Sequence, residues 1–395
     1  MRPVLNQQRM ADLKSLGPSE SEGVGALYHF DSYTDWSRQL HRRMPLGKDV
    51  RMLFDSTVEE PVELLSEVVS KAFCLGPTAH YESIFGRGNG RLIAALAKRY
   101  GVGEAQLLTT TGVVVGLRQV LSALVKAGDR VLVETPCFDV LAAMVGFAGA
   151  ERGTLERSFP DYQLTPQMLD AAICERTRMV VISNLHNPSG HVLGEERIAA
   201  LEAVARSRGV WLVVDEVYAD LARPVISPLP VLPNLIRLNS LSKVFGLHGL
   251  RCGWMVADQA VIERIAVHNS TREFGISKLS HAVAAMVIEE PQVFEDHTRT
   301  VVARNRPMLE YHMKAMVDDG VIEVSLPDYG CMAFPRIVEH RDTLALAERL
   351  WREHGLISAP GEMFGAAGHM RLGMGASMQT MDEGLVRLHQ ALKTI

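Results

Sequence analysis

Short apolar runs alternate with longer amphipathic segments through the middle of this chain, and that alternation limits the folds it can adopt. The apolar runs predict strands at residues 130–134, 179–183, 210–214, 234–238 and 252–256. Apolar residues that recur every three or four positions predict helices at residues 91–100, 115–126 and 195–208. Strands that are apolar throughout and alternate with helices form βαβ units. We therefore expect an α/β fold with a mostly parallel central sheet and helices on both faces.

The sequence pattern changes after about residue 290. The elements predicted there are helices at residues 292–316, 343–354 and 381–392 and strand-like segments at 321–325, 330–335 and 370–374. This mixture predicts a smaller α+β domain. We divide the chain into an N-terminal arm (1–50), a large domain (51–290) and a small C-terminal domain (291–395). The arm looks irregular, and we expect it to become ordered by docking on a partner chain.

Composition excludes several classes of protein. The 395 residues are 47% hydrophobic and 22% charged, which is ordinary for a soluble globular protein. A net charge of −5 gives no reason to expect a nucleic-acid partner. We find neither an apolar run long enough to cross a membrane nor the apolar core of a signal peptide. The five cysteines show no CxxC spacing. These features predict a cytoplasmic enzyme with no metal site and no membrane partner.

One lysine, Lys243, stands between small hydroxyl residues and a glycine-bearing loop, directly after an apolar run. A lysine that is partly desolvated has a lowered pKa, which frees its amine to attack carbonyl groups. Ser240, Ser242 and Arg251 are suited to bind a phosphate beside it. A lysine that forms an imine next to a phosphate site is typical of enzymes that use pyridoxal 5'-phosphate. A solvated lysine at a strand–loop junction would give the same local sequence.

Polar residues follow three consecutive predicted strands at the points where the strands end. Asn187 follows the first strand, Asp215 and Tyr218 follow the second, and Lys243 follows the third. Ligands of open α/β sheets bind beyond the carboxyl ends of the strands, so we expect these side chains to share one site. Taken alone, Asn187 also fits a turn and Asp215 also fits a helix N-cap.

These segments resemble the class I and II aminotransferases, which are pyridoxal-phosphate enzymes of fold type I. The motifs that carry the resemblance are Thr111–Gly112–Val113–Val114, Asn187–Pro188–Ser189–Gly190, Asp215–Glu216–Val217–Tyr218, Ser240–Leu241–Ser242–Lys243, Gly249–Leu250–Arg251 and His369–Met370–Arg371–Leu372. They extend over most of the chain. The resemblance implies an aminotransferase that moves an amino group from an amino acid to a 2-oxo acid, and a homodimer with shared active sites.

The resemblance also implies a role for each residue around the cofactor ring. Lys243 would form the aldimine with the cofactor and then act as general base and acid. Asp215 would pair with the pyridine nitrogen and keep it protonated. Asn187 and Tyr218 would hydrogen-bond to the phenolate oxygen of the ring, and Phe138 would stack on the ring.

Two further groups of residues follow from the same resemblance. The cofactor phosphate would be held by Gly112, Val113, Val114, Ser240, Ser242 and Arg251, with Tyr81 contributed to the partner subunit's site. Arg371 would bind the substrate α-carboxylate in a bidentate fork, next to Asn187. A structural arginine paired with a nearby acid is the simpler interpretation of Arg371.

The chain departs from the family pattern at three places. Val113 and Val114 stand where the family often has polar side chains at the phosphate, and Phe138 replaces the commoner tyrosine. The segment 54–59 lacks the glycine usually found in the N-terminal substrate loop. The residues that shape the side-chain pocket are therefore not given by the resemblance.

Three other functions compete with that of a transaminase. A nicotinamide dehydrogenase would need a GxGxxG turn after a strand, and residues 86–90 lack that spacing. A non-catalytic pyridoxal-phosphate module of a transcription regulator would need a DNA-binding domain that the arm is too short to hold. A β-eliminating lyase of the C–S lyase type would use the same site, because an arginine on the α-carboxylate favours cleavage of the Cα–H bond in both reactions. That alternative stays open.

Overall fold

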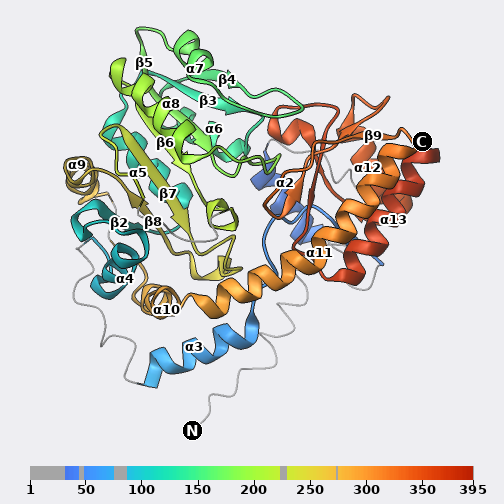
Figure 1. The fold of residues 1–395 in the computed structure, drawn as a ribbon, viewed down its shortest axis with the longest axis horizontal. Helices are drawn as coiled ribbons and strands as arrows, with labels where there is room; N and C mark the ends of the chain where they lie inside the picture. Colours follow the sequence, from blue (N-terminus) through green and yellow to red (C-terminus); the bar gives the residue numbers. More distant parts are fainter. Residues whose placement is uncertain (1–31, 44–48, 75–86, 223–228, 273–274, 395) are drawn as a thin grey trace, which may run out of the picture.

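The computed structural model describes residues 32–43, 49–74, 87–222, 229–272 and 275–394. Figure 1 shows two units: a sheet flanked by helices, and a smaller group of helices and short strands that contains the C-terminus. The long helix α11 (Gln292–Asp318) runs from the first unit into the second. This is the predicted α/β fold with a smaller α+β part.

Seven strands within the described residues form the central sheet. They are β2 (Leu107–Thr110), β3 (Arg130–Thr135), β4 (Glu151–Glu156), β5 (Thr177–Ser183), β6 (Trp211–Asp215), β7 (Leu235–Ser240) and β8 (Gly253–Val256). Their order in the sheet is β2-β8-β7-β6-β5-β3-β4. Only β8 runs against the others, because it is antiparallel to both β2 and β7. The carboxyl ends of β5, β6 and β7 therefore meet at one edge of the sheet.

The alternation of side chains along the buried strands explains why helices cover both faces. Val131 and Val133 of β3 belong to a core cluster that also contains residues of α5 (Val113–Leu124), α6 (Asp139–Phe147) and α9 (Gln259–Asn269). Leu132, between them, belongs to a cluster with residues of α7 (Pro166–Ala172) and α8 (Glu195–Ser207). Successive residues of a strand point to opposite faces, so a fully apolar strand needs a layer on each side.

A third core cluster closes the sheet unit at its β2 end. It joins α4 (Gly90–Tyr100) and α10 (Lys278–Glu289), with residues of α3 (Val62–Cys74) packed against it. Helix α4 begins at Asn89, whose side chain accepts from the backbone N–H of Leu92, and ends at Gly101 in the left-handed region. Such caps satisfy backbone groups that a helix leaves unpaired at its ends.

The C-terminal unit packs α11, α12 (Thr343–His354) and α13 (Met378–Thr394) against short strands. These strands are β9 (Ile322–Glu323), β10 (Met332–Ala333), β11 (Arg336–Ile337), β12 (Leu356–Ile357), β13 (Ala359–Pro360) and β14 (Met370–Gly373). Strand β14 lies between β10 and β13 and is antiparallel to both. Leu309, Leu350 and Leu385, one from each long helix, lie in its shared apolar cluster. No helix in the described part of the chain is long and apolar enough to span a bilayer.

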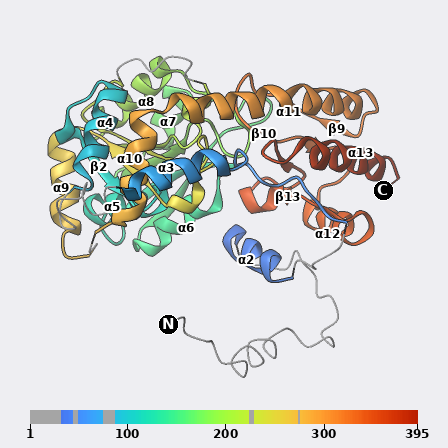
Figure 2. The same cartoon turned by 90° about the horizontal axis from the view of Figure 1, so that it is seen from below.

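The expectation of an irregular N-terminal arm is wrong for its described part. Residues Tyr33–Arg43 form the helix α2, which buries Trp36 and Leu40 completely or nearly so. Seen from below in Figure 2, α2 lies beside α12, and both contribute to one apolar cluster. The helix was missed because its apolar face is only two side chains wide and is buried by residues distant in the sequence. Residues 1–31 and 44–48 lie outside the described part of the chain.

The short segment directly after the arm pairs with the C-terminal unit. Strand β1 (Arg51–Met52) is paired with β12 of the C-terminal unit rather than with the central sheet. The backbone N–H of Leu53 donates to Ile357, and that of Gly373 donates to Leu53. Residues 51–53 are therefore held by the C-terminal unit, although Tyr33 of the preceding helix contacts Asp139 of the sheet unit. The divisions predicted at residues 51 and 290 stay predictions.

Candidate active site

The site lies beyond the carboxyl edge of β5, β6 and β7. Ser183 at the end of β5 is in register with Asp215 at the end of β6, and Asp215 is in register with Leu238 of β7. Asn187 follows β5 by a short loop, and Lys243 follows β7 in the same way. The structure thus brings together three of the side chains predicted from strand ends.

Asp215 is a buried carboxylate with little to neutralise it. Its Oδ1 accepts a hydrogen bond from the backbone N–H of Val217 at 3.2 Å. Burial raises the pKa of Asp215 to about 7, and the nearby charge of Glu134 adds to the rise while Lys243 opposes it. Within the described residues, Asp215 makes no ion pair at hydrogen-bond distance. A buried carboxylate of this kind is stabilised by a cation placed against it.

Lys243 is half-buried, and its amine is held close to the N-terminal loop. Its Nζ donates to the hydroxyl of Thr57 at 3.1 Å. Burial lowers the pKa of the Lys243 amine, and the charge of Asp55 opposes that shift more than any other group. A lowered pKa increases the share of neutral amine near pH 7, which is the form that attacks carbonyls and accepts protons.

Arg371 of β14 is the most informative charge in the site. Its side chain is 1% exposed. Within the described residues, Nη1 donates to Asn187 Oδ1, and Nη2 donates to the Tyr33 hydroxyl and to the Phe54 carbonyl, each at 3.0 Å. Its Nε is buried without a hydrogen-bond partner, and no carboxylate pairs with it in this part of the chain. A buried guanidinium with neutral acceptors alone is suited to bind an anionic ligand.

Tyr218 and Phe138 were predicted at the ring and occupy defined positions. The Tyr218 hydroxyl is 2.8 Å from the hydroxyl of Ser56, and burial raises its pKa well above the ordinary value. Phe138 directly precedes α6, and the ring of Tyr33 meets it edge-on with 5.3 Å between centroids. The charge of Arg371 acts on Tyr218, and Phe138 contacts Tyr33, whose hydroxyl accepts from Arg371. Tyr81 lies outside the described residues.

The predicted phosphate residues also come together. Gly112 precedes α5 with a φ of 80°, and a Cβ there would lie 2.6 Å from Nη2 of Arg251. The backbone N–H groups of Val113 and Val114 begin that helix, where unpaired donors favour anions. Ser240 is buried, and its hydroxyl accepts from the backbone N–H of Ser242 at 3.2 Å. Only glycine allows the Arg251 guanidinium to approach the helix N-terminus so closely.

A buried polar chain that sequence reasoning missed supports this edge of the sheet. Glu134 of β3 accepts from Arg157 Nη1 at 2.7 Å and from the backbone N–H of Ser183 at 2.6 Å. The Ser183 hydroxyl also donates to Glu134 and accepts from the backbone N–H of Asn187 at 3.0 Å. Asn187 then accepts from Arg371. The chain of contacts holds Asn187 in place and adds negative charge near Asp215.

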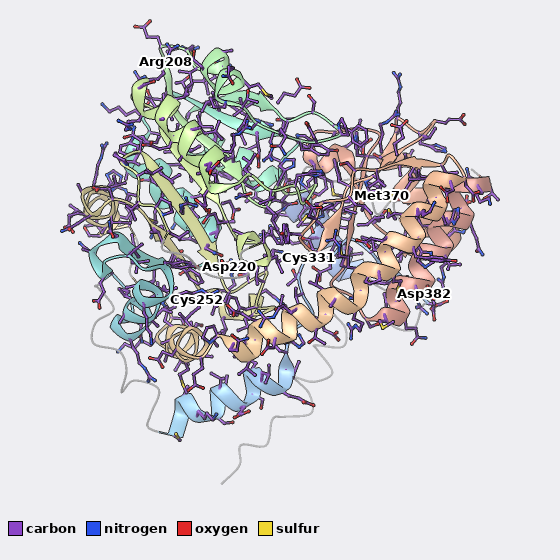
Figure 3. All side chains as sticks on the ribbon, viewed as in Figure 1. Arg208, Asp220, Cys252, Cys331, Met370 and Asp382 are labelled. Carbon is purple, nitrogen blue, oxygen red and sulfur yellow. The ribbon has the colours of Figure 1, made fainter. Side chains whose placement is uncertain are left out.

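The N-terminal loop at residues 54–59 was placed at the substrate by the resemblance, but no role was predicted for its individual residues. Ser56 and Thr57 touch Tyr218 and Lys243, and the Cys331 thiol donates to the Ser56 carbonyl at 3.1 Å. Figure 3 shows Cys331 where the sheet unit and the C-terminal unit meet. Hydroxyl residues in a loop are common, so only their tertiary contacts identify them as part of the site.

The chain matches the class I and II aminotransferases over residues 81–388 and belongs to that family. Capreomycidine synthase from Streptomyces vinaceus is 33% identical over 315 residues, which cover 78% of this chain and 80% of that protein. An arginine–pyruvate transaminase from Pseudomonas aeruginosa is 27% identical over 367 residues, covering 88% and 91% of the two chains. A mutant aspartate aminotransferase from Thermus thermophilus has a TM-score of 0.79 at 24% identity, covering 99% of this chain and 100% of that one.

The protein is therefore a pyridoxal-phosphate-dependent aminotransferase with the fold of type I enzymes. The residues described above fit that cofactor. Gly112 leaves room beside Arg251 for an anion at a helix N-terminus, Asp215 is a buried carboxylate without a cation, and Lys243 is an amine with a lowered pKa. These are the partners that a phosphate, a ring nitrogen and an aldehyde require.

Proposed function

We propose that Lys243, Asp215 and Arg371 are the groups that carry amino transfer in this protein. The observation that carries the proposal is the unmatched charge of two buried groups, Asp215 and Arg371, with the amine of Lys243 in the same site. When bound, pyridoxal phosphate supplies an electron sink for negative charge that develops at the substrate α-carbon. Asp215 holds the ring nitrogen in its positively charged form, and Lys243 removes and returns the α-proton.

Neighbouring residues orient the reacting groups in this proposal. Asn187 and Tyr218 donate hydrogen bonds to the phenolic oxygen of the cofactor, and Phe138 packs against its ring. Arg371 binds the substrate α-carboxylate, which leaves the α-hydrogen as the group presented to Lys243. The bond between Arg371 and Asn187 supports this arrangement, because it couples the carboxylate site to the ring site. A β-eliminating lyase remains the second candidate, since its first step removes the same hydrogen.

The phosphate is held by backbone N–H groups of Gly112, Val113 and Val114 together with Ser240, Ser242 and Arg251. The helix N-terminus and the close approach of Arg251 to Gly112 support that assignment. Arg251 is exposed in the single chain. We propose that a second copy covers this side, that Tyr81 is its contribution, and that the working unit is a homodimer.

We also propose that the enzyme works in the cytoplasm. All five cysteines of the sequence are free, and two of them, Cys74 and Cys174, are exposed. Exposed free thiols favour a reducing compartment.

The test is a half-reaction with purified, cofactor-loaded enzyme and a panel of amino acids. A transaminase converts the absorption of the bound aldehyde form to that of the amine form, without release of ammonia. A β-eliminating lyase given a β-substituted amino acid releases ammonia and a 2-oxo acid and regains its starting absorption. Borohydride reduction and peptide mapping should place the pyridoxyl group on Lys243, and a label on another lysine would overturn the assignment.

A further inference from the structure

The names of the relatives point to different substrates, so the donor has to be inferred from the charges in this site. In the proposed function, Asp215 faces a ring cation and Arg371 faces an α-carboxylate. Two carboxylates near Arg371, Asp139 and Asp55, have no such partner. Within the described residues, neither makes an ion pair at hydrogen-bond distance.

Asp139 is the first residue of α6, directly after the ring-stacking Phe138. Its Oδ2 accepts from the backbone N–H of Tyr33 at 2.6 Å. Its Oδ1 is buried and has no hydrogen-bond partner in the described part of the chain. An acceptor that is buried and unsatisfied destabilises a fold unless a ligand supplies the missing donor.

Tyr33 connects Asp139 to the substrate position. The same residue that donates to Asp139 through its backbone accepts from Arg371 through its hydroxyl at 3.0 Å. Its ring also meets Phe138 edge-on. Burial raises the pKa of Asp139, while the backbone N–H groups of Tyr33 and Val140 and, to a smaller extent, the charge of Arg371 lower it. The carboxylate of Asp139 is thus within electrostatic reach of the carboxylate anchor.

Asp55 lies near Arg371 on the N-terminal loop, next to Phe54. It follows Phe54, whose carbonyl accepts from Arg371 Nη2, and its Oδ1 accepts from the backbone N–H of Thr57 at 2.8 Å. Thr57 in turn contacts Lys243. Asp55 is exposed, so its charge is screened by solvent more than that of Asp139.

We propose that the amino donor has a cationic side chain, a guanidinium or an ammonium, and that Asp139 binds it, with Asp55 adding to the negative potential. The inference rests on the proposed function, in which Arg371 holds the α-carboxylate. A cationic side chain provides the donor that Asp139 Oδ1 lacks, and a bidentate guanidinium matches a carboxylate best. A dicarboxylic substrate would bring a third negative charge beside Asp139 and Asp55, so such amino or oxo acids should react poorly.

The experiment compares donors that differ in charge but hardly in shape. Arginine and citrulline are one pair, lysine and norleucine another, and glutamate is the dicarboxylic control. For the wild type, we expect kcat/KM of the half-reaction to favour arginine over citrulline by about 10- to 100-fold, the loss typical of one charge-assisted hydrogen bond. Equal reactivity of the two donors, or a preference for glutamate, would overturn the proposal.

The decisive variant is Asp139→Asn, because an amide oxygen still accepts from the Tyr33 backbone while the charge is lost. We expect it to lower kcat/KM for arginine toward that for citrulline and to leave citrulline unchanged. Asp161→Asn is the matched control, since Asp161 is exposed and also accepts from a backbone N–H, that of Gln163. A loss shared equally by both donors would mean that Asp139 only holds α2 in place, and the proposal would be wrong.

The proposed amino transfer and the proposed cationic donor can be disproved separately. If no amino acid converts the bound cofactor, the proposed function itself is wrong. If neutral donors react and cationic donors do not, amino transfer stands and the cationic donor class is excluded. The wild-type comparison decides this point even where Asp139→Asn fails to fold.

Discussion

The cofactor side of the site comes from neighbouring strand ends of one sheet, whereas the substrate side is assembled from distant parts of the chain. Asp215 ends β6, and Asn187 and Lys243 follow the adjacent parallel strands β5 and β7. Arg371, in contrast, contacts Tyr33 and Phe54, which are 338 and 317 positions away from it. The sheet fixes the first group through its backbone pairing. The second group depends on how α2 and the N-terminal loop pack on the C-terminal unit.

This difference separates two kinds of mutational effect. Changes on the cofactor side should affect the chemical step for every substrate. Changes on the substrate side should act mainly on substrate binding and leave cofactor retention intact. Variants at both sides of the site can therefore show whether cofactor and substrate residues act separately.

Lys243→Ala should have the largest effect and abolish measurable turnover with all donors. Its amine is the group placed to remove and return the α-proton, and no other amine in the described residues lies in the site. Pyridoxal phosphate should still bind without a covalent bond, because the phosphate and ring contacts remain. Absorption spectra and steady-state rates check both parts, and appreciable turnover by this variant would contradict the assigned role.

Asp215→Ala should lower kcat by about a thousandfold or more, since a charge that stabilises the transition state from a buried position is lost. The KM for amino acids should change much less. Single-turnover kinetics with the cofactor-saturated variant would measure the effect. A decrease of less than about tenfold would leave Asp215 with only the turn-stabilising role that its bond to the backbone N–H of Val217 indicates.

Arg371→Ala should raise KM for amino acids by about 100-fold, because the α-carboxylate loses a bidentate charged partner. Retention of the cofactor should be nearly unchanged. Arg371→Lys should recover little, since an ammonium cannot reproduce the planar fork that now contacts Asn187, Tyr33 and Phe54. Simple amines that react as well as amino acids with the native enzyme would show that Arg371 is not the anchor.

Tyr33→Phe should lower kcat/KM by about tenfold, the lower end of the usual loss for a hydrogen bond to a charged group. The variant keeps the ring that meets Phe138 and removes only the hydroxyl that accepts from Arg371. We expect the loss in KM rather than kcat. Tyr311→Phe is a suitable control, because Tyr311 is 72% exposed. An effect on kcat alone would mean that Tyr33 acts with the cofactor-binding residues and not with the substrate-binding residues.

Asp215→Asn should make the cofactor-free protein more stable at pH 8 by a few kcal/mol at most, with about 4 kcal/mol as the upper limit. Burial raises the pKa of Asp215 to about 7 in the folded chain, so ionisation opposes folding above that pH. The penalty is absent below about pH 4, where folded and unfolded carboxyls are both protonated. Denaturant unfolding between pH 5 and 8 should therefore show a difference that shrinks as pH falls. A difference independent of pH would contradict this origin.

The sequence was sufficient for the parts of the site that depend on local pattern. Fully apolar strands predict a sheet that is buried on both faces. Residues at or just after the carboxyl ends of such strands lie at the edge of the sheet, as Asp215 and Lys243 do. The catalytic and binding roles of these residues stay predictions. Strand β4 was missed because it lies at the sheet edge and is largely exposed along its length. Its polar alternation resembles a loop more than a buried strand.

Tyr33 and Glu134 could not be found in that way, for two physical reasons. Tyr33 begins a helix with only two buried side chains, too few to give a recognisable helical periodicity. Glu134 is a carboxylate in a strand of otherwise buried residues, and nothing local indicates that Arg157 and Ser183 satisfy it. Both residues matter through partners that only the tertiary fold supplies.

The pairing of β1 with β12 has a consequence for the chain as it is being synthesised. Arg51 and Met52 meet Leu356 and Ile357, so the N-terminal part of the chain is made first and finds its partners last. The sheet strands from β2 to β8 can pair once residue 256 has emerged from the ribosome. Trp36 and Leu40 of α2 remain without their cover from Trp351 and Ile357 until nearly the whole chain is available. In the nascent chain this apolar cluster stays incomplete until Trp351 and Ile357 have been made, and incompletely covered apolar surface favours chaperone binding.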